Sequence, residues 1–384
     1  MTFLSIFAIS FTVCGLLLVT KKFHLTRSIR MDDCRAVQAA HRRPTPRIGG
    51  LGVLIAILIV LLFMVPEAQA RTMRIFAVSL IPTFAAGLVE DLGYRVSPQR
   101  RLLAAFASSG LVMLMLDTWI TDTGLPGLDH LLLLLPFALL WTGTWTAGLC
   151  HGFNLIDGVN GLAATTGLLV SLGLAAIALQ SGQPGLAFVA LAMVPAILGF
   201  LVFNWPFGGI FLGDAGAYSL GHLLSWLGIF IAAGSDRVSG VSVGLLFFWP
   251  VADTFLAMYR RRKSSRPASA PDRLHFHQLV MRGIEIGWTG RSRRHLSNPL
   301  TTVVLLPLIG LPVALGVVFW DNPLGAALSL TVLGVAFVVA YNNGMRYVQR
   351  RRRGAAGRPG FVAPVPALRP APVRRAAPPA RVRA

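Results

Sequence analysis

Five carboxylates lie at or next to the ends of long apolar segments, where they can do chemistry: Glu90, Asp91, Asp157, Asp214 and Asp253. An ionisable group at membrane depth costs about 2.5 to 3.5 kcal/mol on insertion scales, so it persists mainly where it is partnered, hydrated or functional. The charges along the chain place all five ends on one face of a membrane. That face is the candidate active site.

Glu90 and Asp91 are adjacent, and adjacent acids repel unless a cation or a proton intervenes. A divalent metal or a basic substrate group would satisfy them. The alternative is an interfacial acid pair that is neutralised by the nearby Arg95, Arg100 and Arg101.

Asn154, Asp157 and Asn160 recur every three residues among glycines. This spacing predicts that three oxygen-bearing side chains point to one side of a helical turn. Hard oxygen donors suit Mg²⁺, and the glycines allow a phosphate or nucleotide to approach the backbone. The alternative is a polar helix cap with Asp157 or Asn160 as the N-cap.

Asp214 follows a glycine-rich turn that carries Phe207 and Phe211, two aromatic rings that could stack on a base. The alternative is a first-turn acid that complements the helix dipole. In the long segment 259–299, His275 and His277 follow Arg273. Solvated loop histidines are one interpretation. The spacing of a structural zinc site is missing, so phosphate binding is the better hypothesis.

Membrane helices must position these residues. The chain is 54% hydrophobic and 13% charged, with a mean hydropathy of +0.66, which is more apolar than a soluble core requires. Runs of about 20 apolar residues can each span a bilayer. We therefore predict an all-α polytopic membrane protein with about eleven transmembrane helices, near 3–20, 48–65, 73–89, 102–120, 131–149, 160–180, 185–203, 212–233, 238–258, 300–320 and 324–342.

The basic residues orient these helices. With the N-terminus outside and the first helix retained, 32 of the 35 Lys and Arg residues fall on the cytoplasmic side, together with the C-terminus. The transmembrane domain is predicted to cover residues 1–343, and an Ala/Pro/Arg-rich tail, 344–384, is predicted to be disordered. The cytoplasmic catalytic loops are 21–47, 90–101, 150–159, 204–211 and 259–299.

The net charge of +20 does not indicate nucleic-acid binding, because the basic residues are spread over juxtamembrane loops without a nucleic-acid motif. Contact with anionic membrane lipids explains the charge instead.

The order and placement of the motifs resemble the polyprenyl-phosphate N-acetylhexosamine-1-phosphate transferase family (MraY and WecA type, glycosyltransferase family 4). The WecA-like branch fits better, because the MraY branch usually carries three consecutive histidines. The resemblance covers roughly residues 41–285. Besides Glu90 and Asp91, its motifs are Pro44–Gly50, Asn154–Ala163, Phe211–Gly221, Trp249–Thr254 and Pro271–Arg282.

The resemblance implies transfer of a sugar 1-phosphate, with N-acetylglucosamine as first choice, from a UDP-sugar to polyprenyl phosphate with release of UMP. This would be the first membrane step of a cell-surface polysaccharide pathway. Asp91 would orient or deprotonate the lipid phosphate, and Asp214 would hold Mg²⁺, with Mn²⁺ as an alternative. Asn154 and Asp157 would complete the metal and nucleotide pocket.

The same resemblance implies that Phe211 stacks on uracil. Arg273, His275 and His277 would bind the phosphates or the sugar, and Arg101 would add a phosphate contact. The implied setting is the cytoplasmic membrane of a bacterium, with the active site facing the cytoplasm and a homodimer as the family-based assembly.

Three positions depart from the family pattern. Glu90 replaces an aspartate and remains in the catalytic set, Asn160 replaces an aspartate and remains in the substrate-binding set, and Gln278 replaces a third histidine. All three keep a polar group. Competing hypotheses are another UDP-sugar, namely FucNAc, QuiNAc or MurNAc-pentapeptide, and a transporter or flippase.

Overall fold

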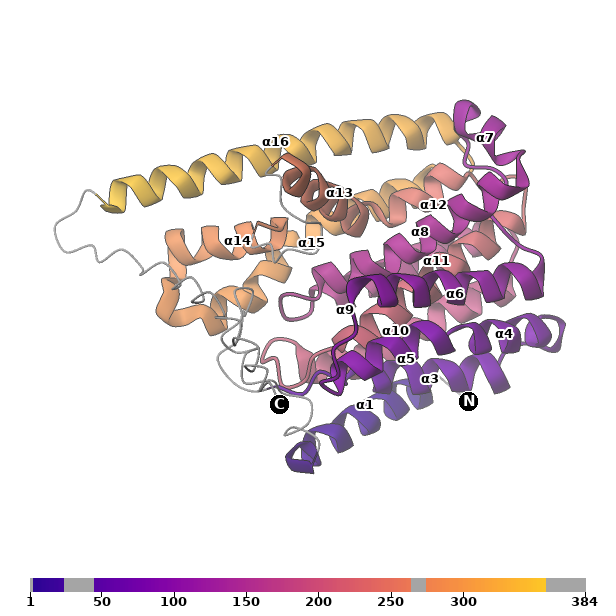
Figure 1. Ribbon diagram of the computed structural model, residues 1–384, viewed down its shortest axis with the longest axis horizontal. Coiled ribbons are helices and arrows are strands. Elements are labelled where there is room, and N and C mark those ends of the chain that lie inside the picture. The colour runs from indigo at the N-terminus through magenta and orange to yellow at the C-terminus, as the bar shows by residue number, and fades with distance from the viewer. Residues whose placement is uncertain (1–2, 24–44, 264–273, 357–384) are drawn as a thin grey trace, which may run out of the picture.

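The computed structural model describes residues 3–23, 45–263 and 274–356, and this part of the chain is almost entirely helical and contains no strand. The helices are α1 (Phe3–Val19), α3 (Gly50–Phe63), α4 (Glu67–Ser79), α5 (Ile81–Asp91), α6 (Pro98–Leu116), α7 (Pro126–Leu132), α8 (Leu135–Ile156), α9 (Leu162–Gln180), α10 (Pro184–Asn204), α11 (Gly213–Ala233), α12 (Gly240–Leu246), α13 (Phe248–Lys263), α14 (Phe276–Ile284), the π-helical turn η1 (Glu285–Thr289), the 3-10 turn η2 (Arg291–Arg293), α15 (Arg294–Val318) and α16 (Pro323–Ala356). Figure 1 shows them as one elongated bundle, with α16 along one edge and α1 along the other.

Each apolar segment predicted from the sequence coincides with one helix or with two consecutive helices. Six helical segments of the described chain are long and apolar enough to cross a membrane, and up to eight are if each bent pair is one span. The helices α1 and α3 are apolar but shorter. A multi-pass all-α membrane protein is therefore confirmed, whereas the count of eleven and the orientation of the termini stay predictions.

Two of the predicted spans are bent. The helices α7 and α8 meet at 115°, and α12 and α13 meet at 78°. Both breaks lie within continuous apolar sequence. Hydropathy therefore predicts one apolar segment in each case, although the structure has two helices there. Figure 1 places α7 at one end of the bundle and α14 at the other.

The helix α11 is the centre of the bundle, and nearly all of its residues are buried. It packs against α8, α5, α3 and α9. Glycines permit this close packing: a Cβ on Gly50 of α3 would lie 2.2 Å from the Cα of Gly216 on α11. Small residues at helix crossings allow backbones to approach inside a membrane.

A buried polar seam joins α4, α6, α8 and α11. The Ser79 hydroxyl lies 3.0 Å from Nε2 of His222, at the joint between α4 and α5. The Trp226 indole donates to the Ser109 hydroxyl, which lies 2.5 Å from the hydroxyl of Thr146. Such bonds hold helices together where the bilayer offers no water. The seam docks the end of α4 on α11.

Two predicted boundaries differ from the structure. The segment 259–299, expected as a loop, contains the end of α13, all of α14, both short turns and the start of α15. The helix α16 continues to Ala356, past the expected domain boundary at residue 343. The rest of the predicted disordered tail, 357–384, lies outside the described residues.

Candidate active site

Asp91 caps the N-terminus of α11 from the end of α5. Its two carboxylate oxygens accept the backbone N–H groups of Asp214 and Ala215, at 2.9 and 2.8 Å. The first N–H groups of a helix lack partners within the helix, and a negative charge is favourable there. Asp91 is only 2% exposed. Its carboxylate therefore positions Asp214, the next functional residue.

The turn into α11 requires glycine at residue 213. Gly213 has a φ of +78°, and a Cβ there would lie 1.8 Å from the carbonyl oxygen of Arg47 and 2.7 Å from Oδ2 of Asp91. The left-handed conformation and the lack of space both exclude a side chain. The glycine-rich turn thus brings the Arg47 segment and the end of α5 together at the N-terminus of α11.

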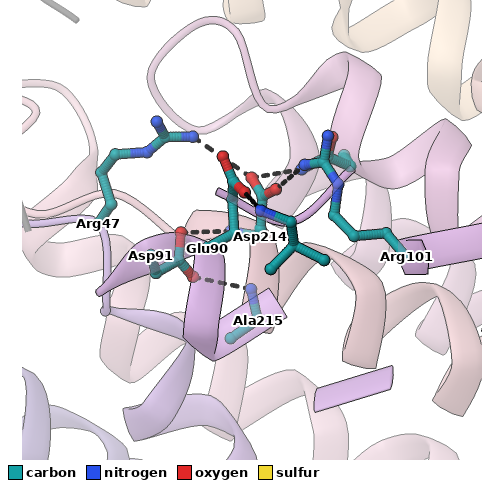
Figure 2. A network of polar contacts seen from close by, with 8 residues as sticks. Arg47, Glu90, Asp91, Arg101, Asp214 and Ala215 are labelled. Atoms are coloured by element: carbon teal, nitrogen blue, oxygen red, sulfur yellow. Dashed lines mark hydrogen bonds and ion pairs between the residues drawn. The ribbon is translucent and has the colours of Figure 1, made fainter. Parts of the chain in front are cut away.

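The Asp214 carboxylate is the centre of a cluster drawn from four elements (Figure 2). The amide Nδ2 of Asn154, on α8, donates to its Oδ1 at 2.9 Å. Arg47 donates to the same oxygen at 3.3 Å, and Arg101 at the start of α6 pairs with Oδ2. The two guanidinium groups approach Asp214 from opposite sides. A buried carboxylate and two cations make this an anion-handling site.

Arg47 was not singled out from the sequence, although its motif was. Backbone hydrogen bonds join its segment to the turn before α11: Phe211 N–H to the Pro46 carbonyl at 2.8 Å, and Gly49 N–H to the Phe211 carbonyl at 2.8 Å. This pairing carries the Arg47 side chain to Asp214. The only signal in the sequence was a basic residue between two turn-forming prolines and a Gly pair.

Asp157 follows α8 and faces the same cluster. Burial raises its pKa to about 7, with repulsion from Asp214 in the same direction, while Arg47 and the Gly213 N–H oppose the shift. The predicted set Asp91, Asn154, Asp157 and Asp214 is thus brought together, with Arg101 beside it.

A second cluster joins α13 to α14. Asp253 accepts from the Phe276 N–H at 2.9 Å and lies 2.9 Å from Nδ1 of His275, so it caps α14 and orients that imidazole. Nδ1 of His277 lies 3.8 Å from the same carboxylate. The two imidazole rings are stacked, with centroids 5.6 Å apart. Arg273, predicted as a third member, lies outside the described residues.

The loop after α8 connects the two clusters. A Cβ on Gly158 would lie 2.6 Å from Nε2 of His277, so the imidazole packs directly on the residue next to Asp157. His277 is fully buried, and burial lowers its pKa to about 4, against the attraction of Asp253. His277 is therefore neutral near pH 7.

The structure corrects the prediction for Asn160. The helix α8 ends at Ile156, so the three-residue spacing does not bring Asn160 to the same side as Asp157. Its Nδ2 instead donates to the Pro206 carbonyl at 2.7 Å, and its N–H donates to Asn298 of α15 at 2.7 Å. The N-cap alternative also fails, because the residue before α9 is Gly161.

Two more predicted residues have local roles. Oε2 of Glu90 accepts the Val96 N–H at 2.7 Å and so shapes the turn between α5 and α6. The backbone of Phe211 pairs with residues 46 and 49, and its ring is partly exposed. The neighbouring Phe207 is 89% exposed.

The carboxylates of the Asp214 cluster are possible ligands of a metal ion. The described residues contain no group of three or more His, Cys, Asp or Glu side chains that could hold an ion. Mg²⁺, however, usually binds through one or two carboxylates plus waters and substrate phosphates. Asp214 and Asp157 supply that number of hard oxygen ligands. The site therefore fits a metal that is shared with a phosphate substrate.

Comparison with known proteins confirms the resemblance that the motifs indicated. Residues 72–232 match the family model described as "Glycosyl transferase family 4". A "probable undecaprenyl-phosphate N-acetylglucosaminyl 1-phosphate transferase" of Bacillus subtilis (strain 168) is 28% identical over 244 residues, 63% of this chain and 67% of the relative. An "undecaprenyl-phosphate alpha-N-acetylglucosaminyl 1-phosphate transferase" of Escherichia coli O157:H7 is 25% identical over 278 residues, covering 70% and 72%.

A mycobacterial relative has a similar named activity. A "decaprenyl-phosphate N-acetylglucosaminephosphotransferase" of Mycobacterium leprae (strain TN) is 25% identical over 271 residues, 63% of this chain and 67% of the relative. The family model includes the Asp91, Asp157 and Asp214 positions and ends before the Asp253 cluster.

Proposed function

We propose that this protein transfers an N-acetylhexosamine 1-phosphate, with N-acetylglucosamine as first choice, from a UDP-sugar to polyprenyl phosphate and releases UMP. The observation that carries the proposal is the Asp214 carboxylate between two arginines, beside Asp157, at the end of the central helix of a membrane bundle. The named activities of the relatives in Bacillus, Escherichia and Mycobacterium support it.

The reaction needs charge neutralisation above all. An oxygen of the lipid phosphate attacks the β-phosphorus of the nucleotide sugar, the bond from that phosphorus to the bridging oxygen breaks, and UMP leaves. Both partners are anions, so guanidinium groups that face the phosphates lower the barrier. Arg101 and Arg47 lie in the position to supply them. Mg²⁺ or Mn²⁺, held by Asp214 and the substrate phosphates, would add positive charge and orient the diphosphate.

Asp157 is the best proton acceptor of the cluster. A general base works best when its pKa lies near the working pH, and that of Asp157 is raised to about 7. The resemblance implied this role for Asp91, but its carboxylate oxygens instead accept hydrogen bonds from the backbone N–H groups at the N-terminus of α11. We therefore assign the last proton of the lipid phosphate to Asp157 and the positioning of Asp214 to Asp91.

An apolar cavity of about 570 Å³ between α8, α11, α12, α13 and α16 can take part of the isoprenoid chain of the acceptor. Aromatic and aliphatic side chains line most of it, including Trp141, Trp145, Phe248 and Phe255. It borders α8 and α13, the two helices that carry Asn154 and Asp253. The cavity lining does not include Asp214 or the residues that contact it, so the cavity would hold a part of the chain that is remote from the phosphate. We propose that the charged ends of these helices face the bacterial cytoplasm.

A transfer assay tests the proposal. Membranes that overexpress the full chain are supplied with undecaprenyl phosphate, Mg²⁺ and radiolabelled UDP-N-acetylglucosamine. We expect lipid-linked label that requires the metal and is lost in Asp214→Asn. The matched control is Asp321→Asn, which removes a half-exposed carboxylate paired with Arg237 and remote from the site.

The negative outcomes are informative. No transfer from folded protein with this donor, but transfer from another UDP-sugar, would correct the sugar alone. Failure with every donor would overturn the transferase and favour the transporter.

A further inference from the structure

We propose that Arg47 is a further substrate-binding residue, which pairs with Asp214 in the free enzyme and moves to the diphosphate when metal and nucleotide bind. The inference rests on the proposed function. It goes beyond the charge neutralisation proposed above, because it makes Arg47 a competitor of the metal for the Asp214 carboxylate.

The backbone of Arg47 is fixed, so only its side chain can move. Gly49 N–H and Gly50 N–H donate to the carbonyls of Phe211 and Leu212, at 2.8 and 2.9 Å. The Arg47 carbonyl itself packs on Gly213 so closely that no Cβ fits between them. The guanidinium is thus tethered within one side-chain length of the Asp214 carboxylate.

The two arginines at Asp214 differ in burial and contact. The Arg47 side chain is 40% exposed and lies 3.3 Å from Oδ1, whereas Arg101 is 18% exposed. The Arg101 guanidinium also lies over the ring of Tyr218, 5.9 Å from its centroid. The Arg47–Asp214 contact is part-buried, but its guanidinium is the more exposed of the two and loses less hydration at Asp214 than Arg101 does. Of the two cations at Asp214, Arg47 is therefore the one placed to turn toward an incoming phosphate, and Arg101 is the more confined one.

The metal and the diphosphate would act on the Arg47 guanidinium in opposite ways. If a metal were held by the Asp214 carboxylate, its positive charge would repel the Arg47 guanidinium that contacts Oδ1 of Asp214. The displaced guanidinium then faces the incoming phosphates, whose oxygens its planar fork matches. Arg47 should thus oppose binding of the metal alone and favour binding of the diphosphate.

These opposite effects separate this role from a structural one. In purified full-length protein in nanodiscs, Mn²⁺ alone is titrated by electron paramagnetic resonance, and UDP is titrated by calorimetry in the presence of Mg²⁺. We expect Arg47→Gln to bind Mn²⁺ about threefold more tightly and UDP about tenfold more weakly. Arg47→Lys, which keeps the charge but loses the fork, should bind Mn²⁺ as the wild type does and UDP with intermediate affinity.

Arg237→Gln is the matched control, because it removes an exposed arginine that pairs with Asp321 away from the site. It should change neither affinity. Equal losses of Mn²⁺ and UDP affinity in Arg47→Gln, or no change in either affinity, would overturn the inference. The proposed function would still stand if the wild type transfers sugar phosphate. A folded wild type that neither binds UDP nor transfers sugar phosphate would overturn both.

Discussion

Asp91 and Asp214 lie side by side, but the first accepts backbone N–H groups and the second faces the arginines. We predict that Asp91→Asn lowers the melting temperature more than Asp214→Asn does. An amide can satisfy only one of the two N–H groups, and the loss of a helix cap costs about 1 to 2 kcal/mol. Both variants should lose most of their transfer activity. Thermal unfolding in detergent, measured beside transfer, tests the distinction, and equal melting temperatures would contradict it.

The buried His277 makes the protein sensitive to acid. Its pKa in the folded state, about 4, lies below the ordinary value of 6.5, so the unfolded chain binds the proton more readily. Stability from this group is therefore complete above about pH 6.5 and is lost as the pH falls toward 4. We expect a loss of about 2 kcal/mol between pH 7 and pH 5.

The check is the melting temperature at pH 7 and pH 5 in the wild type and in His277→Gln. The glutamine has no proton to gain in this range, so the variant should show the smaller decrease. The same decrease in both proteins would assign acid sensitivity to other groups.

For single residues, the sequence predicted the acids of the site better than the basic residues that contact them. Asp91, Asp157 and Asp214 could be selected because a carboxylate beside an apolar segment needs a reason. Arg47 could not, since its contact with Asp214 spans 167 positions of the chain. Asn160 was misplaced because the end of α8 is set by the packing of the following loop.

Among the elements, the loop after α8 is the joint between the two clusters, and Gly158 sets its distance from α14. We predict that Gly158→Ala lowers transfer by about tenfold to a hundredfold, because the new methyl would displace the His277 ring and shift α14. Gly148→Ala on α8 is the matched control, since a Cβ there meets nothing within 4 Å. Normal activity in Gly158→Ala would show that α14 does not need its present position.

Long apolar runs predicted the helices, but not their breaks or the helix α14. The bends between α7 and α8 and between α12 and α13 lie within continuous apolar sequence. The basic composition of 259–299 suggested a loop, yet Phe276 of α14 packs against Trp249 and Phe337 on two other helices. Tertiary packing of this kind overrides local composition.

For the whole molecule, the sequence predicts an orientation in the membrane. The distribution of Lys and Arg predicts that residues 90–101 face the cytoplasm and that the turn after α11 faces outward. In a chain whose cysteines are replaced by serine, we expect Asp236→Cys to react with a membrane-impermeant maleimide in intact cells. Arg95→Cys should react only after permeabilisation. The reverse pattern would place the active site on the outer face.

The backbone pairing of residues 46–50 with 211–213 has a consequence for exchanging parts between relatives. Arg47 comes from before the region that the family model matches, and the Asp253 cluster comes from after it. A chimera that transplants 72–232 alone would combine one parent's Asp214 with the other parent's arginine-bearing segment. We expect such hybrids to be inactive unless residues 45–50 are exchanged together with residues 207–214. This active site therefore has to be transplanted as a pair of distant segments and not as one contiguous segment.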